Sequence, residues 1–251
     1  MNYMTRYLLL SASLYVSISP VFASDAHWSY QGNHGPAHWG ELGNALCASG
    51  THQSPINVQM KALHPQKGDK QALSIHYGEA ALTVVNNGHT IQATVPEGET
   101  VRFQNTEYHL AQFHFHTPSE HQRNGSSYPM EMHLVNKDAT GQLLVIGVMV
   151  KEGRKNTELA SLWQHLPKTQ GEETTLSASD APNLAKLLPA ASHHLFYKGS
   201  LTTPPCTEGV QWVLIEQPIE MSKSQINQFR KLFPKNNRPV QKTNHREVIE
   251  D

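Results

Sequence analysis

The segment Gln112-Phe113-His114-Phe115-His116, together with Glu131-Met132-His133-Leu134-Val135, decides how this chain folds. In an extended strand alternate side chains share a face, so His114 and His116 project together while the phenylalanines enter the opposite layer. Residues 117–128 contain Pro and Gly and can return the chain, which places the second segment antiparallel beside the first. The pattern therefore predicts two adjacent strands with three imidazoles on one face.

Three imidazoles from two neighbouring strands predict a His₃ metal site with an open fourth position, which is typical of a catalytic zinc. Ligating histidines usually form a hydrogen bond through their second ring nitrogen. Gln112 and Glu131 each precede one of these histidines by two residues, so either can orient a ring. An isolated His-x-His pair is more often structural, but the Glu-x-His in the expected neighbouring strand favours the metal site.

Short extended segments dominate the rest of the chain. Turn signals such as Asn87-Gly88 and Glu97-Gly98 separate runs rich in β-branched residues. Strands are expected over 82–85, 91–95, 100–103, 108–116, 129–136, 143–150 and 211–216. Helices are expected over 156–166, from its apolar face, and after Ser222, from a capping box with Gln225. We therefore predict a mainly β fold, a mostly antiparallel sheet with short peripheral helices and long loops.

Charge and cysteine content narrow the function. Lys and Arg number 20 against 21 Asp and Glu, so the net charge is −1. This balance argues against a nucleic-acid-binding protein or a polybasic membrane-surface protein. The chain has 16 histidines but only two cysteines, too few for a disulfide-knit miniprotein or a zinc-finger array.

Residues 1–23 have the pattern of a secretory signal peptide. Arg6 is their only charge, an apolar stretch follows, and Val21-Phe22-Ala23 is a small-residue cleavage pattern. A membrane anchor is disfavoured because the apolar stretch is shorter than the roughly 20 residues that span a bilayer. We expect cleavage after Ala23, a mature catalytic domain over 24–251 without a membrane span, and a periplasmic or secreted location. In an oxidising compartment the two cysteines are expected to form a disulfide, with metal ligation as the alternative.

Further motifs run through the mature chain in a fixed order. They are Trp28-Ser29-Tyr30, His38-Trp39-Gly40, the segments 53–57 (Gln-Ser-Pro-Ile-Asn) and 86–89 (Asn-Asn-Gly-His), Ser119-Glu120-His121, residues 197–208, and Asn237-Arg238-Pro239. With the histidine segments, this set resembles the alpha-class carbonic anhydrases of the exported bacterial type. The resemblance implies a central twisted sheet and one zinc per chain. It also implies reversible hydration of carbon dioxide to bicarbonate and a proton, by attack of zinc-bound hydroxide.

The resemblance assigns roles residue by residue. His114, His116 and His133 match the zinc ligands. Thr202 matches the residue that accepts a hydrogen bond from zinc-bound hydroxide, and Glu120 matches the carboxylate that accepts one from Thr202. The remaining matches are the proton shuttle His89, the bicarbonate contact Thr203, the apolar wall Val135, Val145, Leu201, Val210 and Trp212, the water-ordering residues Tyr30, Asn87 and Gln92, and the disulfide Cys47–Cys206.

Taken singly, several of these residues have simpler interpretations. Each wall residue alone would be ordinary sheet core, and Asn-Gly-His alone would be a turn with an exposed imidazole. His121 is expected to be structural. The resemblance also implies inhibition by aryl sulfonamides and small anions, and a monomer or homodimer.

Three other functions compete with a carbonic anhydrase. A cupin-type metal enzyme shares the His-x-His followed by Glu120, but its last histidine would stand in a separate, later motif. A carbonic-anhydrase-like zinc-binding module without activity should lack a ligand, whereas all three histidines, Thr202 and Glu120 are present. A zinc-storage protein would need many clustered ligands.

Overall fold

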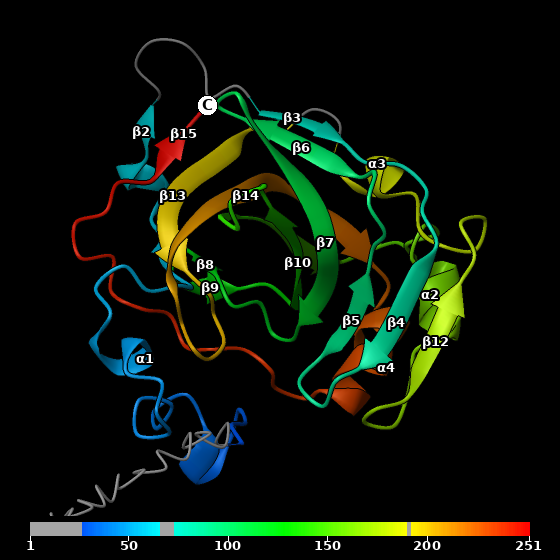
Figure 1. Ribbon diagram of the computed structural model, residues 1–251, viewed down its shortest axis with the longest axis horizontal. Helices are drawn as coiled ribbons and strands as arrows, with labels where there is room; N and C mark the ends of the chain where they lie inside the picture. Colours follow the sequence, from blue (N-terminus) through cyan, green and yellow to red (C-terminus); the bar gives the residue numbers. More distant parts are fainter. Residues whose placement is uncertain (1–26, 66–72, 190–191) are drawn as a thin grey trace, which may run out of the picture.

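Within residues 27–65, 73–189 and 192–251, which a computed structural model describes, twelve strands form one mixed sheet (Figure 1). The predicted signal peptide, residues 1–23, lies outside the described residues. The strands follow the order β12 (Glu173–Leu176), β4 (Leu82–Asn86), β5 (Ile91–Thr94), β7 (Thr106–His116), β10 (Met130–Lys137), β11 (Leu143–Glu152), β14 (Glu208–Met221), β13 (His194–Ser200), β15 (Ile249–Glu250) and β2 (His64–Pro65). β6 (Thr100–Phe103) pairs with β7 and carries β3 (Leu73–His76).

Most strand pairs are antiparallel, which confirms the predicted sheet. The exceptions in the large sheet are β11 with β14 and β15 with β2, which run parallel. A parallel pair needs a long crossover connection. Here the crossover is residues 153–207, and it contains β12, β13 and two short helices. β1 (Asn57–Val58), β8 (Gln122–Arg123) and β9 (Ser126–Ser127) form a separate small sheet.

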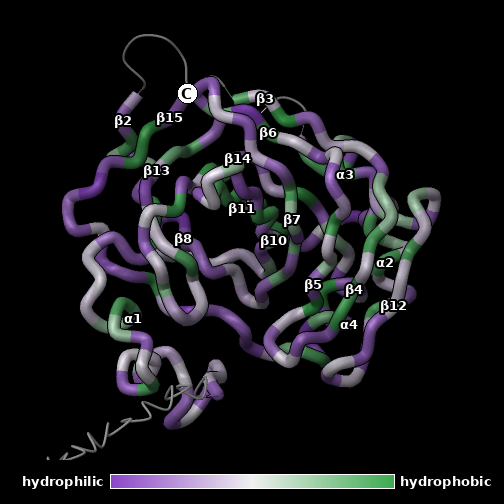
Figure 2. Tube along the Cα trace, viewed as in Figure 1, coloured by the Kyte–Doolittle hydropathy of each residue, from purple (hydrophilic) through white to green (hydrophobic). Residues whose placement is uncertain are grey.

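The apolar residues divide between the two faces of the sheet. Phe113 and Phe115 enter the large hydrophobic cluster, as their alternation with the histidines predicted. Trp163 and Phe229 pack against Phe115, with ring centroids 5.0 and 5.9 Å away. A second, smaller cluster surrounds Trp212 on the other face. β10 and β11 are therefore buried on both sides, and Figure 2 shows them in the interior.

The helices are short and peripheral: α1 (Leu46–Ser49), α2 (Ala160–Gln164), α3 (Leu184–Leu187) and α4 (Lys223–Leu232). α4 begins with the predicted capping box, because Ser222 Oγ accepts from the Gln225 backbone N–H and Gln225 Oε1 accepts from the Ser222 N–H. None of the described helices is long and apolar enough to cross a membrane.

α2 is shorter than the predicted helix over 156–166. At its start, Asn156 Oδ1 accepts the Leu159 N–H, which makes a turn outside the helix. At its end, Leu166 precedes Pro167, and a residue before proline is disfavoured in the helical conformation. The apolar periodicity is therefore present, but local side-chain and proline chemistry limits the helix.

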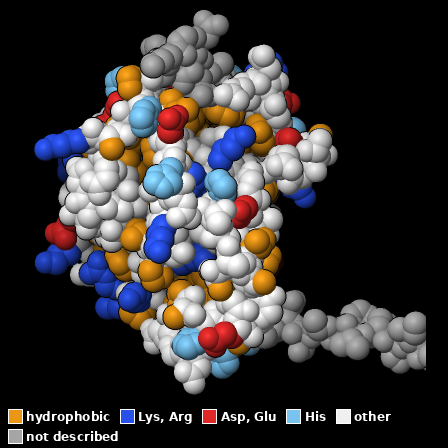
Figure 3. Space-filling view, turned by 90° about the vertical axis from the view of Figure 1, so that its left-hand side faces the viewer, with side chains coloured by type: hydrophobic (Ala, Val, Ile, Leu, Met, Phe, Trp, Pro, Cys, Tyr) orange, Lys and Arg blue, Asp and Glu red, His pale blue; other side chains and the backbone are white. Residues whose placement is uncertain are grey.

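The surface offers little exposed apolar area. In Figure 3, charged and histidine side chains are interspersed with small apolar areas on the face that carries the C-terminal segment. Over the described ranges, Leu46 and Val240 are the only exposed large hydrophobic residues. The described surface therefore presents no large apolar patch.

Candidate active site

The three predicted histidines meet where β7 and β10 pair. His133 lies opposite His114 in the antiparallel register, and His116 lies opposite Glu131. One ring nitrogen from each of the three histidines lies within 4.8 Å of the other two. His116 and His133 are buried, and His114 is partly exposed. The group is therefore almost entirely enclosed, and His114 is its most accessible member.

Each histidine uses its other ring nitrogen in a hydrogen bond. His114 Nδ1 lies 2.7 Å from Gln112 Oε1, and His133 Nε2 lies 2.8 Å from Glu131 Oε1. Each of these acceptors stands two residues before its histidine on the same strand face, because side chains alternate. The tautomers that donate these bonds leave His114 Nε2 and His133 Nδ1 free for a metal.

The partner of His116 was not found from the sequence. His116 Nδ1 lies 2.7 Å from the backbone carbonyl of Asn236. The Asn236 side chain donates to the carbonyls of His89 and Phe115, and it accepts the Thr117 N–H. The neighbouring motif Asn237-Arg238-Pro239 was singled out from the sequence. The Asn236 carbonyl could not be identified in this way, because every residue has a backbone carbonyl and the residue type gives no signal for this role.

Two buried polar atoms without hydrogen-bond partners indicate what the three-histidine group could hold. His116 Nε2 and Glu120 Oε2 are buried and have no hydrogen-bond partner in the described structure. Glu120 Oε2 lies 3.6 Å from His116 Nε2 and 3.9 Å from His133 Nδ1. Unpartnered buried polar atoms are rare and need an explanation. Three imidazole nitrogens facing one another fit a zinc ion.

The electrostatic environment suits metal binding. Burial, reinforced by His116 and His133, holds the pKa of His114 well below its usual value, and burial also lowers the pKa of His116. Burial opposes charge on His133 as well, but the Glu131 carboxylate outweighs it and raises that pKa. Neutral imidazole is the form that ligates a metal, so desolvation favours it at two of the three positions.

Glu131 stands in a wider buried network. Its Oε1 also accepts from His121 Nδ1 at 2.7 Å, and its Oε2 accepts the backbone N–H groups of Glu120 and His121. His121 Nε2 lies 2.6 Å from the Tyr197 hydroxyl. Burial raises the pKa of Glu131, but His121 and His133 outweigh it and hold that pKa well below the usual value. The network keeps Glu131 ionised and fixed against His133.

Glu120 approaches the group from a loop, and Thr202 also lies in a loop. Glu120 Oε1 accepts the backbone N–H of Arg238 at 2.8 Å. Thr202 is buried and Thr203 is partly buried in the segment between β13 and β14. Glu120 Oε2 has no hydrogen-bond partner among the described residues, so it does not accept from Thr202 in this structure. The relay that the resemblance implies remains a prediction.

The five residues predicted to line an apolar wall belong to one cluster. Val145, Val210 and Trp212 are buried members, and the partly buried Val135 and Leu201 pack against them. Val135, Val145 and Trp212 pair across β10, β11 and β14, two residues along from His133. The Trp212 ring centroid lies 4.9 Å from that of His133. The apolar cluster therefore begins directly beside the histidine group.

His89 lies in the turn between β4 and β5. Its ring is stacked on Trp28, with centroids 3.7 Å apart, and His27 is 6.2 Å away. Burial, followed by the charge of His27, lowers the pKa of His89. Sequence reasoning did not pair His89 with Trp28, because a contact between segments 61 residues apart leaves no local signal.

The three predicted water-ordering residues occupy different places. Gln92 lies on β5 opposite His114. Asn87 Oδ1 accepts the backbone N–H groups of His89 and Thr90, so this atom shapes the turn that carries His89. Tyr30 makes edge contacts with Trp28 and Trp39, and burial, aided by Glu120, raises its pKa well above the usual value.

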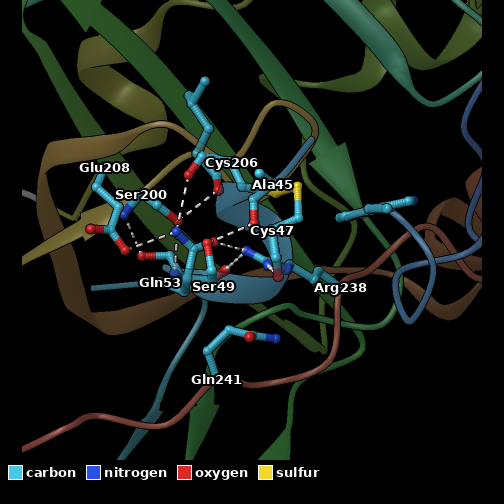
Figure 4. Close-up of a disulfide and its surroundings, with 12 residues drawn as sticks. Ala45, Cys47, Ser49, Gln53, Ser200, Cys206, Glu208, Arg238 and Gln241 are labelled. Atoms are coloured by element: carbon cyan, nitrogen blue, oxygen red, sulfur yellow. Dashed lines mark hydrogen bonds between the residues drawn. A yellow bond between two sulfur atoms is a disulfide. The ribbon is translucent and has the colours of Figure 1, made fainter. Parts of the chain in front are cut away.

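The two cysteines form the predicted disulfide. Cys47 and Cys206 are bonded with an S–S distance of 2.04 Å, and Figure 4 shows the bond beside Arg238 and Gln53. Cys206 belongs to the same loop as Thr202, where the Cys206 N–H donates to the Thr203 carbonyl. The disulfide therefore connects the N-terminal segment to this loop, and the cysteines are not metal ligands.

Fold and site together define a β-sheet protein with a buried three-histidine group suited to a metal ion. The family model for the eukaryotic-type carbonic anhydrases matches residues 34–251. The chain belongs to this family, which removes the cupin alternative.

Bacterial carbonic anhydrases are similar in sequence to this protein over most of the chain. A carbonic anhydrase of Pectobacterium atrosepticum is 40% identical over 245 residues, which is 96% of each chain. One from Klebsiella pneumoniae is 41% identical, covering 96% of this chain and 97% of the relative. The alpha-carbonic anhydrase of Thermovibrio ammonificans, solved with the inhibitor sulfanilamide, superposes with a TM-score of 0.85 at 41% identity, covering 90% of this chain and all of that one.

The same fold also occurs in a protein with another name. A structure of dioscorin complexed with ascorbate superposes with a TM-score of 0.80 at 26% identity, covering 89% of this chain and 97% of that one. Because a fold can host several functions, the activity must be argued from the site.

Proposed function

We propose that this carbonic anhydrase hydrates carbon dioxide reversibly to bicarbonate and a proton at a zinc ion held by His114, His116 and His133. The observation that carries the proposal is the buried His116 Nε2, which has no hydrogen-bond partner in the described structure and faces the free nitrogens of the other two rings. A binding module without activity would not require Glu120 to point into the same space.

The donor set is complete for zinc. Gln112, the Asn236 carbonyl and Glu131 fix the three ring orientations, and such partners typically matter about 10- to 100-fold for metal affinity. When bound, zinc supplies a Lewis acid that lowers the pKa of a coordinated water to about 7.

Thr202 and Glu120 orient the nucleophile in this proposal. Glu120 is held by the Arg238 backbone N–H, and its second oxygen is free to accept a hydrogen bond. The Thr202 hydroxyl, donating to that oxygen, would have to accept from the nucleophile, and this fixes the direction of attack. Thr203 would contact the bicarbonate product.

The apolar wall receives the substrate. Carbon dioxide has no net charge or dipole, so a wall of Val135, Val145, Leu201, Val210 and Trp212 can hold it without competing hydrogen bonds. Three of these residues lie two positions from His133 along the paired strands, which supports attack from the metal side.

Proton release is proposed to run through His89. A partly buried imidazole with a lowered pKa gives up its proton readily near neutrality. Tyr30, Asn87 and Gln92 are proposed to order water between His89 and the metal. The Asn87 amide nitrogen serves this role, because its Oδ1 already accepts two backbone N–H groups.

We further propose an exported protein that aryl sulfonamides inhibit, located in the periplasm or secreted. The Cys47–Cys206 disulfide supports export, because disulfides persist in oxidising compartments. Inhibition rests on the relative solved with sulfanilamide.

The experiment is metal analysis beside stopped-flow hydration of carbon dioxide. The wild type should hold about one zinc per chain and be active. His116→Ala should lose both properties, whereas His109→Ala, on the exposed face of the same strand, should keep both. Tightly held zinc without hydration activity in the wild type would overturn the proposal.

A further inference from the structure

Arg238 is a buried cation without an ion-pair partner among the described residues. Its side chain is 1% exposed. Its Nη1 donates to Gln53 Oε1 and to the Ser54 carbonyl, both at 2.8 Å, and its Nη2 donates to the Cys47 carbonyl at 2.9 Å (Figure 4). The guanidinium also lies over the Trp39 ring, 5.7 Å from its centroid.

A buried guanidinium is costly to desolvate unless its donors are satisfied. Burial lowers the pKa of Arg238 to about 10, against the opposing charge of Glu120, so the group stays charged at neutral pH. Stability alone is a weak reason to keep such a charge, because an apolar side chain of similar volume is often equally stabilising. The contacts of Arg238 suggest a different reason.

Gln53 connects Arg238 to Cys206, the second cysteine of the disulfide. While Gln53 Oε1 accepts from Arg238, its Nε2 donates to the Cys206 carbonyl and to Glu208 Oε1, both at 3.0 Å. The carbonyls of Cys47 and Cys206 are thus held by one connected pair of side chains. Cys206 lies in the loop 201–207 that also carries Thr202.

The backbone of Arg238 holds the other side of the site. Its N–H donates to Glu120 Oε1 at 2.8 Å, on the carboxylate whose other oxygen faces the histidine group. One residue therefore contacts Glu120 through its main chain and, through Gln53, the loop of Thr202.

We infer that Arg238 is a positioning residue that sets the loop of Thr202 against the Glu120 carboxylate, with Gln53 as the connecting group. The inference rests on the roles proposed for Thr202 and Glu120. Lysine cannot replace the arginine here, because its single ammonium cannot reproduce the two-pronged donation to Gln53 and Cys47.

Arg246 offers a matched control. It also donates to backbone carbonyls in this region, including that of Gln53 at 2.7 Å, and it also lies over an aromatic ring, that of Tyr197. Its hydrogen bonds in the described structure go to the carbonyls of other residues than Cys47 and Cys206, and none goes to Glu120. Arg238→Lys should lower kcat about 10- to 100-fold with KM little changed, as expected for a misplaced catalytic pair. Arg246→Lys should lower the melting temperature by less, because Arg246 is only partly buried, and should leave kcat per bound zinc within about twofold.

A double-mutant cycle tests whether Arg238 acts through Thr202. In a Thr202→Ala background, Arg238→Lys should cause little further loss of kcat, because coupled residues are not additive. An equal loss in both backgrounds, or wild-type kcat in the single variant, would overturn the inference. If Thr202→Ala were itself fully active, the proposed role of Thr202 would fail and Arg238 would have no pair to position.

A readout independent of activity separates this inference from the proposed function. Amide hydrogen exchange over 201–207 should quicken in Arg238→Lys and in Gln53→Glu, which keeps the acceptor for Arg238 but loses the donor to Cys206. It should stay unchanged in Arg246→Lys. Unchanged exchange in both test variants would overturn the inference even if the enzyme is active, and quickened exchange would support it even if hydration were absent.

Discussion

The indole of Trp28 lies flat on the imidazole of His89, with ring centroids 3.7 Å apart and planes inclined by 8°. This stacking covers one face of the proposed shuttle and accounts for part of its burial. It also fixes the ring near His27, whose charge opposes protonation of His89. The N-terminal segment therefore tunes a residue in the turn between β4 and β5.

Trp28→Ala should raise the pKa of His89 toward its ordinary value, because burial is the main cause of the lowered pKa. With a higher pKa, His89 stays protonated to a higher pH, so half-maximal proton release shifts upward in pH. His27→Ala should give a smaller upward shift. NMR titration of the His89 ring protons measures both, and an unchanged or lower pKa in Trp28→Ala would contradict the burial argument.

Gly147 lies opposite His133 on β11, and a side chain there has no room. A Cβ would lie 2.7 Å from Leu214 Cδ2 and 3.1 Å from Glu131 Oε1, the atom that orients His133. Gly147→Ala should weaken zinc binding about tenfold or more, measured by chelator competition. Gly78→Ala is the control, because its nearest neighbour, Glu99 Oε1, is 3.8 Å away. Equal zinc affinity in the two variants would refute the crowding argument.

Replacing both cysteines by serine should lower stability without removing the metal ligands. The disulfide joins residues 159 positions apart, and the chain-entropy model gives about 5 kcal/mol as an upper value for such a loop. Thermal unfolding should show a clear drop in melting temperature at unchanged zinc content. A reductant should destabilise the wild type and leave the double serine variant unaffected; a reductant-insensitive wild type would count against this account.

Asn236→Ala should be strongly destabilising for a polar substitution. It removes three side-chain hydrogen bonds at a position 2% exposed and leaves the Phe115 carbonyl and Thr117 N–H buried without this partner. The expected loss is about 2–4 kcal/mol of unfolding free energy, measured by urea denaturation. Asn183→Ala, which removes the partly exposed N-cap of α3, should cost about 1 kcal/mol. The idea fails if the two losses are equal.

The elements whose signals are local were predictable from the sequence. The alternation of Phe113 and His114 predicted both faces of β7, and Ser222 with Gln225 predicted the start of α4. β13 was missed, because nearly all its residues are buried and it shows no polar alternation. β12 and β3, which are four residues long, were missed as well, although β5 and β6 of the same length were predicted.

The ligand histidines could be selected from the sequence, but their surroundings could only partly be predicted. Gln112 and Glu131 were identifiable because they share a strand face with the histidines they contact. Asn236 was not, because it meets His116 through its main chain from 120 residues away. The Arg238–Gln53 contact likewise joins segments that only the folded chain brings together.

The parallel pairing of β11 with β14 has a consequence for how the site assembles. The three histidines all lie within residues 114–133, on strands that pair directly, so little chain entropy is lost in gathering them. The loop of Thr202 arrives only after the crossover over 153–207 has closed, and Arg238 and Asn236 follow still later in the chain. During folding, β7 and β10 can therefore form a metal-binding hairpin before the loop of Thr202 is in place. We expect the capacity to bind zinc to appear earlier than the capacity for turnover.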